Sequence, residues 1–250
     1  VELDPDYGKA WIQLGYAAIT EADNGFAEPI EGYGRARELA QNALQLSPDI
    51  AEGHAMLQYI HQTLDWDWAA AEAEGRRALA IDPTNSVALN VAGKLATSLG
   101  RWDEAEQHLR AALIRDPLYT YALYNLGMAY YLSGNFATAE DEFQRLMELE
   151  PGFLWTRAAL GKALLAQGKP AAALEVVQDN ADYGERLWAL PIMLQAAGHQ
   201  QEADEALQAQ IAYWAETAAY AVAMSYSYRG DRELAFEWLE RAYRQKDPAL

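Results

Sequence analysis

Small apolar, large apolar and turn-forming residues recur along this chain at a fixed interval. Proline follows an acidic residue at Pro83, Pro117 and Pro151, so both intervals are 34 residues (117 − 83 and 151 − 117). Between and beyond these prolines two glycines and an alanine return in the same order: Gly93, Gly100 and Ala105, then Gly127, Gly134 and Ala139, then Gly161, Gly168 and Ala173. A period of about 20–50 residues indicates an array of repeated units, which presents a long surface more readily than a deep pocket.

Each period is expected to form two antiparallel helices joined by a glycine turn and ended by proline. Glycine can adopt the left-handed backbone that ends a helix, and proline cannot donate the next helical hydrogen bond. Small residues let the two helices approach, while large residues such as Leu126, Tyr130 and Phe143 fill the remaining space. The pattern predicts helical hairpins joined at these glycines: Gly100, Gly134, Gly168, Gly198 and Gly230.

Three departures from the period are visible. The second unit ends 35 residues after the first (83 − 48), one more than the usual interval. The first unit spans 43 residues between prolines (48 − 5), because of a Gly/Pro-rich interruption at Asn24–Gly34. A tolerated surface loop is the main expectation for this interruption, and a lid over a binding surface is the alternative. Less regular helix packing is expected where the first glycine of a unit is replaced, at Gln58, Pro191 and Ala223.

The pattern resembles the tetratricopeptide repeat. The residues that carry this resemblance are Leu126, Gly127, Tyr130, Ala139, Phe143 and Pro151 in one unit, and Trp11, Leu14, Gly15, Ala36, Ala40, Ala43 and Pro48 in the first. The resemblance covers essentially the whole chain, in which seven units can be placed. It implies an all-α fold, an α-solenoid that forms a right-handed superhelix of helical hairpins, with residues 1–250 as a single array.

Two aromatic and acidic runs, Leu64–Glu72 and Ala235–Tyr243, refine the resemblance. They are similar to repeat regions of bacterial signalling proteins, in which such repeats follow a class III adenylate or guanylate cyclase domain or a winged-helix transcriptional regulator domain. The first residues, Val1–Pro5, have the form of a repeat end, like Leu149–Pro151. We therefore expect that the chain was cut from a longer one with an effector domain upstream.

Composition excludes several classes of function. The formal net charge of −18 opposes binding to nucleic acid phosphates, and helical repeats that read RNA need basic grooves. With no cysteine, the chain has no disulfide, thiolate nucleophile or cysteine metal site. No apolar run approaches the length of a membrane span, and no signal peptide is recognisable. We expect an acidic cytoplasmic protein that binds neither nucleic acid nor membrane.

Candidate chemistry is sparse. His54 and His61 are seven residues apart (61 − 54) and face the same way on one helix. Asp65 lies one turn further along. A metal pair favours spacing of four residues or a close third ligand, so we expect these histidines to pack. Gly32-x-Gly34 lacks the preceding strand and third glycine of a phosphate loop, and no Gly-x-Ser-x-Gly elbow occurs. We expect no catalytic residue, no metal site and no cofactor.

The concave side offers better candidates. In stacked hairpins the first helix of each unit lines this side, and its exposed residues recur at fixed offsets. Tyr, Trp and Met are enriched at protein interfaces, although individual aromatics could instead pack between units. The predicted binding residues are Asn90, Lys94, Tyr121, Tyr124, Asn125, Met128, Tyr131, Trp155 and Lys162, with Tyr59, Trp188, Tyr220 and Met224 continuing the stripe.

The preferred function is a non-catalytic protein-interaction module. Some relatives in the family grip a C-terminal carboxylate, but here only Asn125 matches that motif, and Trp155 and Ala159 replace two basic residues. An apolar or aromatic peptide, or the upstream effector domain in cis, is therefore the expected partner. The alternatives are a ligand-sensing module with a small molecule in the groove, and pure scaffolding. A homodimer through the terminal helix, where Phe236 lies off the apolar stripe, is a further prediction.

Overall fold

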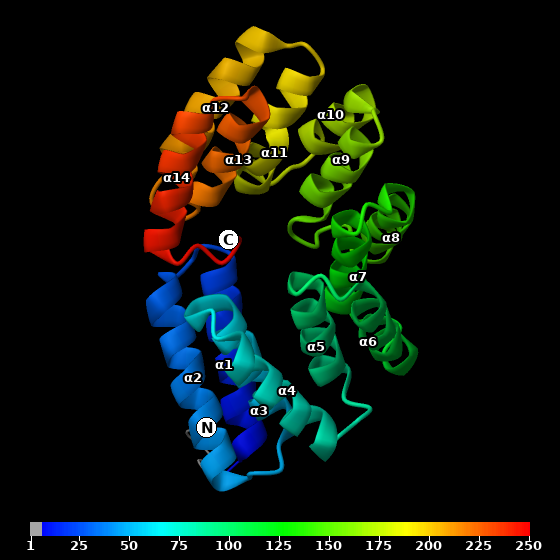
Figure 1. The fold of residues 1–250 in the computed structure, drawn as a ribbon, viewed down its shortest axis with the longest axis vertical. Coiled ribbons are helices and arrows are strands. Elements are labelled where there is room, and N and C mark those ends of the chain that lie inside the picture. The colour runs from blue at the N-terminus through cyan, green and yellow to red at the C-terminus, as the bar shows by residue number, and fades with distance from the viewer. Residues whose placement is uncertain (1–6) are drawn as a thin grey trace. The chain divides into compact units, whose positions relative to one another are not determined.

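The computed structural model describes residues 7–250, and over this range the chain forms helices and no strand. Fourteen α-helices and one π-helical segment follow one another within residues 7–250, confirming the predicted all-α array of hairpins (Figure 1). The repeat-like end at Val1–Pro5 lies outside the described residues. The elements are α1 (Gly8–Asp23), α2 (Pro29–Leu46), α3 (Ala51–Ile60), η1 (His61–Asp65), α4 (Trp68–Ile81), α5 (Ser86–Ser98), α6 (Trp102–Arg115), α7 (Thr120–Leu132), α8 (Phe136–Leu149), α9 (Thr156–Ala166), α10 (Pro170–Gln178), α11 (Tyr183–Ala196), α12 (Gln200–Trp214), α13 (Ala219–Arg229) and α14 (Arg232–Gln245).

The chain divides into two compact units, with the boundary between Leu126 and Gly127. Unit 1 contains α1 to α6 and the first part of α7, and unit 2 contains the rest of α7 and α8 to α14. The boundary falls inside a helix, so no loop linker separates the units. The organisation of residues 1–250 as a single array stays a prediction. None of the helices in the described range is long and apolar enough to cross a bilayer.

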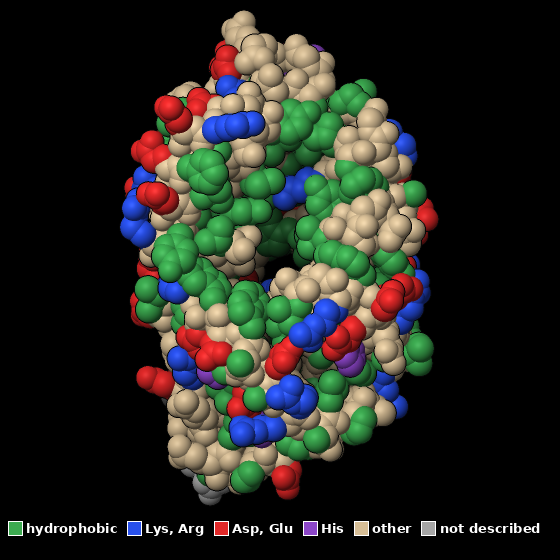
Figure 2. All heavy atoms as spheres, in the orientation of Figure 1, with side chains coloured by type: hydrophobic (Ala, Val, Ile, Leu, Met, Phe, Trp, Pro, Cys, Tyr) green, Lys and Arg blue, Asp and Glu red, His purple; other side chains and the backbone are tan. Residues whose placement is uncertain are grey.

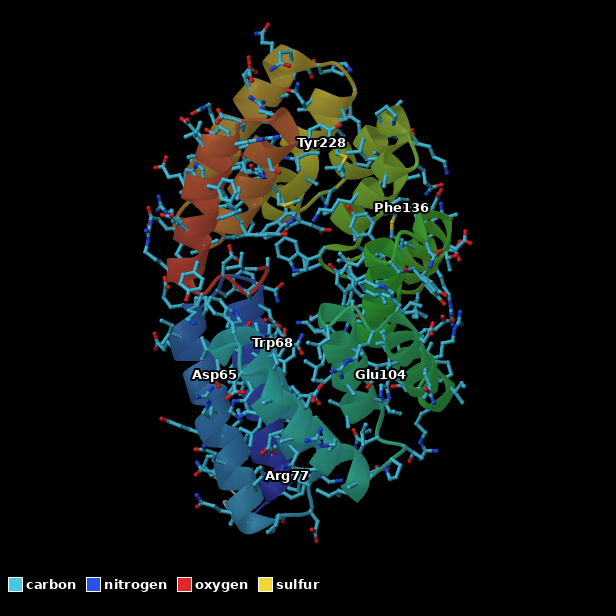
Figure 3. All side chains as sticks on the ribbon, in the orientation of Figure 1. Asp65, Trp68, Arg77, Glu104, Phe136 and Tyr228 are labelled. Atoms are coloured by element: carbon cyan, nitrogen blue, oxygen red, sulfur yellow. The ribbon has the colours of Figure 1, made fainter. Side chains whose placement is uncertain are left out.

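The hairpin turns follow the predicted glycines. All five have a positive φ, from 69° at Gly100 to 86° at Gly134 and Gly198. This left-handed conformation carries little steric penalty for glycine. The turn of the second hairpin has Trp66 instead, with a φ of 56°. Asp65 and Trp68 flank this turn, and Trp68 is exposed at the start of α4 (Figure 3).

Within several hairpins, a glycine of the first helix lies under a large side chain of the second. A Cβ atom added to Gly93 would lie 2.5 Å from Leu109 Cγ, and one added to Gly127 would lie 2.5 Å from Phe143 Cε1. Both pairs are 16 residues apart (109 − 93 and 143 − 127). The repeated glycine is therefore required by close approach of the helices, as expected from the sequence.

The second hairpin reverses the sizes in this contact. Gln58 on α3 replaces the glycine, and the small residue is Gly75 on α4, where an added Cβ would lie 2.5 Å from Gln58 Oε1. The Gln58 side chain is fully buried, and neither of its amide atoms has a hydrogen-bond partner among the described residues. The helices still pack closely at this position, but around an unsatisfied polar group.

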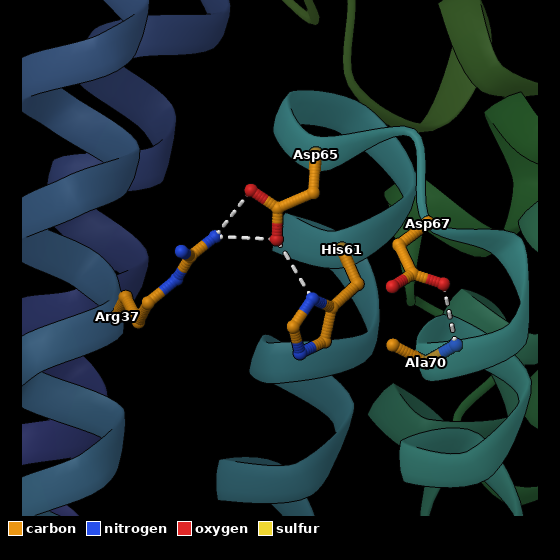
Figure 4. A network of polar contacts seen from close by, with 5 residues as sticks. All are labelled: Arg37, His61, Asp65, Asp67 and Ala70. Atoms are coloured by element: carbon orange, nitrogen blue, oxygen red, sulfur yellow. Dashed lines mark hydrogen bonds and ion pairs between the residues drawn. The ribbon is translucent and has the colours of Figure 1, made fainter.

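The additional residue of the second unit is accommodated in η1. A π-helix bonds residue i to residue i+5 and so fits one more residue into a turn. Asp65 at its end accepts two hydrogen bonds from Arg37 Nη2 of α2, at 2.8 and 2.7 Å, and lies 2.7 Å from His61 Nδ1 (Figure 4). Asp67 then caps α4 by accepting from the Ala70 amide at 2.9 Å.

The histidines of this hairpin are half-buried, as expected for packing residues, and they also make polar contacts that the sequence did not indicate. His54 Nδ1 lies 2.6 Å from Glu74 Oε2, and His61 contacts Asp65 as described above. The half-buried positions favour pairing because imidazole nitrogens need partners when they leave water. Among the described residues no group of three or more His, Asp or Glu side chains is arranged to hold a metal ion.

The interruption at Asn24–Gly34 is mostly helix, so its prediction as a loop is wrong for the second half. Helix α2 already begins at Pro29, which suits the first helical position because its missing N–H needs no partner there. A Cβ added to Gly32 would lie 2.8 Å from Ala22 Cβ of α1. The first hairpin is thus long because its helices have 16 and 18 residues.

Candidate functional site

In unit 1 two predicted residues, Tyr59 of α3 and Lys94 of α5, contact each other. The Lys94 ammonium donates a hydrogen bond of 2.9 Å to the Tyr59 hydroxyl, and its nitrogen lies 4.1 Å from the centre of the Tyr59 ring. The two residues occupy corresponding places in neighbouring hairpins, 35 residues apart (94 − 59). Two side chains that share an offset in the repeat therefore lie together, and their role in binding stays a prediction.

This pair is anchored by Asp23, which the sequence did not indicate. Asp23 is the last residue of α1, and its carboxylate accepts a 2.9 Å hydrogen bond from the Tyr59 hydroxyl at Oδ2. The hydroxyl of Tyr33, on α2, donates to Oδ1 of the same carboxylate. Tyr59 thus bridges a cation and an anion, and these four side chains form one hydrogen-bonded cluster on unit 1.

Burial controls the charges of this cluster. It raises the pKa of the Asp23 carboxyl, an effect that Lys94 and the two tyrosine hydroxyls oppose. Burial also lowers the pKa of the Lys94 ammonium, and the Asp23 charge opposes this shift. Burial and the Asp23 charge raise the pKa of both tyrosine hydroxyls, so they remain protonated donors. The Asp23 and Lys94 charges therefore favour each other, while burial disfavours both.

A second group of polar contacts lies on α5 and α7. Asn125 donates a 2.9 Å hydrogen bond to Asn90 Oδ1, and the Asn90 amide donates to the Tyr119 hydroxyl at 3.4 Å. Asn90 is buried, and burial raises the pKa of Tyr119 to about 12. Tyr119, which precedes α7, was missed because it lies outside the helical offsets. Tyr121 lies beside it with the ring centres 6.3 Å apart, and 48% of Tyr121 is exposed.

Unit 2 carries an aromatic cluster of Trp155, Trp188 and Trp214. The ring centre of Trp155 is 5.1 Å from that of Trp188 and 6.1 Å from that of Trp214. Trp214 is buried and donates its indole N–H to the Gly184 carbonyl at 3.1 Å, whereas the other two rings are half-buried. Figure 2 shows hydrophobic side chains gathered over α11 and α13 on the face in view, with acidic side chains along α12 and α14.

Lys162 of α9 lies beside this cluster. Its ammonium nitrogen is 6.0 Å from the centre of the Trp188 ring. Burial lowers the pKa of Lys162 to about 8. No carboxylate in the described part of the chain pairs with it, and none opposes this shift. Trp155 and Lys162, both predicted from the sequence, therefore both lie next to Trp188, and Trp155 and Trp188 also pack against the buried cluster of Leu187, Trp214 and Ala218.

Two segments match family profiles described as tetratricopeptide repeat, residues 90–152 and residues 130–190. Residues 90–190 therefore contain tetratricopeptide repeats. The matched segments cover hairpins of both units, and together they include all of the predicted binding residues from Asn90 to Lys162. No curated protein sequence matches this chain.

Solved structures of tetratricopeptide-repeat type share this fold. PilF of Pseudomonas aeruginosa is 21% identical, with a TM-score of 0.62 over 89% of this chain and 96% of that one. PilW, described as a widely conserved type IV pilus biogenesis factor, is 22% identical, with a TM-score of 0.65 over 83% and 93%. A thermophilic repeat protein of Thermus thermophilus is 20% identical, with a TM-score of 0.58 over 79% and 99%. Identity at this level shows the fold alone, and the finer resemblance to cyclase and winged-helix proteins stays a prediction.

The exposure of the predicted residues varies along these repeats. Of five side chains expected to be largely accessible, only Tyr121 is exposed. That expectation is wrong for the other four, which are half-buried: Tyr124, Met128, Tyr131 and Trp155. Their large side chains also contact their own helices and neighbours, as Tyr131 does with the Phe136 ring at 5.7 Å between centres. Their assignment as binding residues stays a prediction.

Proposed function

We propose that this chain is a non-catalytic protein-interaction module that binds an extended partner segment along the first helices of its repeats. The observation that carries the proposal is the surface of unit 1 around Tyr121. There, Tyr59, Lys94 and Asn125 come from three successive first helices and are fixed by hydrogen bonds to other side chains. A surface held rigid before binding loses less conformational entropy when a partner arrives.

Residue types at this surface suit a peptide. Tyrosine combines a large apolar ring with a polar hydroxyl, and side-chain amides such as Asn125 can pair with the backbone of an extended segment. The ring of Tyr59 packs against the buried core that contains Tyr33 and Met56, so the fold holds this side chain in place. An aromatic residue that is exposed beside a fixed polar network is typical of a binding position.

The structural relatives support a scaffold role in general terms. PilW is described as a pilus biogenesis factor, and a role in assembling protein partners here is an analogy drawn from the shared fold. An apolar or aromatic segment, either in a separate protein or in an effector domain of the same chain, is the partner we propose. A cytoplasmic location stays a prediction from the sequence.

Selection of peptides against the 250-residue chain tests this function. Random peptides of about 12 residues, displayed as N-terminal fusions, should yield an enriched sequence that competes with a synthetic copy of itself. Tyr121→Ala should then weaken binding by about 2 kcal/mol, because a central aromatic anchor is lost. Its melting temperature should stay close to that of the unmodified chain, since the ring is exposed.

The matched control is Tyr228→Ala on α13, which removes a ring of similar exposure, 45%, that is not among the residues of the proposed surface (Figure 3). It should bind the selected peptides normally. Equal losses in both variants, or no enriched peptide at all, would refute the proposed function. If small molecules raise the melting temperature where no peptide binds, the ligand-sensing alternative is favoured instead.

The terminal helix offers a separate partner prediction. On α14, Phe236 is 67% exposed and Tyr243 is 60% exposed, so much of this apolar surface is open to solvent in the described chain. A homodimer through α14 would bury both rings. Sedimentation of the chain and of Phe236→Glu at several concentrations measures whether this association occurs.

A further inference from the structure

Two lysines occupy the same place in different repeats. Lys94 and Lys162 are separated by two repeat lengths, 68 residues (162 − 94), on the first helices α5 and α9. The surroundings that the chain gives them differ. The Lys94 ammonium donates a hydrogen bond to the Tyr59 hydroxyl, and this hydroxyl donates one to the Asp23 carboxylate. Unit 1 therefore supplies the anion that balances its own lysine.

Unit 2 supplies no such anion. The residue one repeat before Lys162 is Met128 (162 − 128 = 34), whereas the residue one repeat before Lys94 is Tyr59. The thioether of methionine is only a weak hydrogen-bond acceptor. The neighbour of the Lys162 ammonium is instead the face of Trp188. Burial without an opposing carboxylate leaves its pKa at about 8, far below the ordinary 10.5. A partially desolvated cation in this position gains most from an incoming anion.

We propose that Lys162, Trp155 and Trp188 form a subsite for one aspartate or glutamate side chain flanked by a large apolar residue of the partner segment. This inference rests on the proposed function and specifies the chemistry of its ligand in unit 2. The carboxylate would pair with the Lys162 ammonium, and the apolar neighbour would pack on the two half-buried indole rings.

Three observations fix this choice of ligand. Lys94 shows that a side-chain carboxylate, reached through a hydroxyl, satisfies a lysine at this repeat position. The net charge of −18 repels strongly acidic segments, so a single carboxylate in an apolar context is favoured over an acidic run. The adjacent tryptophans offer a broad apolar surface, which an acidic run would not cover.

The backbone at Trp155 also indicates a prepared surface. Trp155 has a φ of 70°, in the left-handed region that bulky residues seldom adopt. Such a conformation costs of order 1–3 kcal/mol and persists only where surrounding contacts impose it. Here the contacts are those of the indole with Trp188 and Trp214. The ring is thereby positioned before any ligand arrives.

A double-mutant cycle with the selected peptides tests the subsite. The peptides are displayed as N-terminal fusions, so none carries a free C-terminal carboxylate, and their common sequence should contain one Asp or Glu beside an aromatic or aliphatic residue. Lys162→Gln should weaken binding at least about tenfold, as should replacement of that acidic residue by its amide. The two changes together should cause little further loss, because both remove the same interaction.

Lys169→Gln is the matched control, because it removes one positive charge from an exposed residue of unit 2 whose partner is Glu140. It should bind peptides like the unmodified chain. Binding to the unmodified chain should also weaken as pH rises above about 8, where free Lys162 loses its proton, and this dependence should vanish in Lys162→Gln. Melting temperatures of both variants show that they are folded.

The outcomes separate this inference from the proposed function. Peptides that bind through Tyr121 but show no coupling to Lys162 would leave the function intact and overturn the subsite. Failure to select any peptide would overturn both. Synthetic copies of the selected peptides could bind only with a free C-terminal carboxylate and not as C-terminal amides. That result would show that Lys162 binds the C-terminus of the peptide, and it would overturn the assignment to an acidic side chain.

Discussion

At the scale of single residues, the lysine at one repeat position is linked to a carboxylate in unit 1 but not in unit 2. Lys94 compensates the charge of Asp23 through Tyr59, whereas Lys162 compensates no charge in the described chain. The difference follows from the neighbours and not from the lysine. Burial of an ion is tolerated when a partner is present and is unfavourable when it is absent.

Replacing each lysine by methionine should therefore change stability in opposite directions. Lys94→Met should lower the free energy of unfolding by about 1.5–3 kcal/mol, because Asp23 is left without its cation. Lys162→Met should raise it by about 1 kcal/mol near neutral pH, because a desolvated charge is removed. Urea denaturation of the unmodified chain, Lys94→Met and Lys162→Met measures both changes in the free energy of unfolding. A loss of stability in Lys162→Met would show that its ammonium has a partner in the folded chain.

The gain from Lys162→Met should shrink as pH rises. The pKa of Lys162 is about 8 in the folded chain, below its ordinary 10.5, so between these values the unfolded chain binds more protons. Stability of the unmodified chain then rises with pH over this window relative to the variant. Below about pH 8 the unfavourable charge is fully present, and the difference between the proteins should be constant.

Sequence reasoning named Lys94, Asn90 and Asn125 as candidates but did not name Asp23. The first three share offsets within the repeat, and repetition makes these offsets visible. Asp23 ends the unusually long α1, and only that additional helical length brings its carboxylate to Tyr59. No periodic signal marks such a residue, because its role depends on the length of one particular helix.

At the scale of elements, the hairpins depend on pairing a small residue with a large one. The position of the small residue was predictable where glycine repeats, as at Gly93 and Gly127. The reversal at Gln58 and Gly75 was not, because the identity of the residue under Gln58 depends on how η1 shifts the following helix. The 35-residue spacing indicated an additional residue but not where the helix would absorb it.

Two glycine substitutions separate close packing from helix propensity. Gly93→Ala should lower the free energy of unfolding by about 1–2 kcal/mol, because its Cβ would lie 2.5 Å from the buried Leu109 side chain. Gly34→Ala should raise it by about 0.5–1 kcal/mol, since this helical position has no neighbouring atom within 4 Å and alanine favours helix. Thermal and urea unfolding of both variants check the two signs.

A compensating substitution makes this test specific. Leu109→Val shortens the large side chain that faces residue 93. The double variant Gly93→Ala with Leu109→Val should recover part of the lost free energy of unfolding, because the added methyl group then has more room. A stabilising effect of Gly93→Ala alone would contradict the close approach of α5 and α6 at this position.

At the scale of the whole molecule, the repeat continues through the boundary between the two compact units. The helix α7 contains that boundary, and the predicted binding residues lie on both sides of it, with Tyr124 and Asn125 in unit 1 and Met128 and Tyr131 in unit 2. Periodicity predicts the hairpins of each unit, because it reflects contacts between neighbouring helices. It does not predict a division into units, which depends on how strongly each hairpin packs on the next.

Local destabilisation of unit 2 should reveal how far cooperativity extends along the array. Phe143 is fully buried in α8 over Gly127, so Phe143→Ala should create a cavity that lowers stability by about 3–5 kcal/mol. In repeat proteins each hairpin is stabilised mainly by its neighbours, so openings can remain local. Hydrogen exchange followed by mass spectrometry should therefore show faster exchange in α8 and α9 and unchanged protection in α1 and α2. Ile12→Ala, in the core of the first hairpin, is the reciprocal control and should give the opposite pattern. Equal loss of protection throughout the described chain in either variant would instead show that all hairpins unfold as one cooperative body.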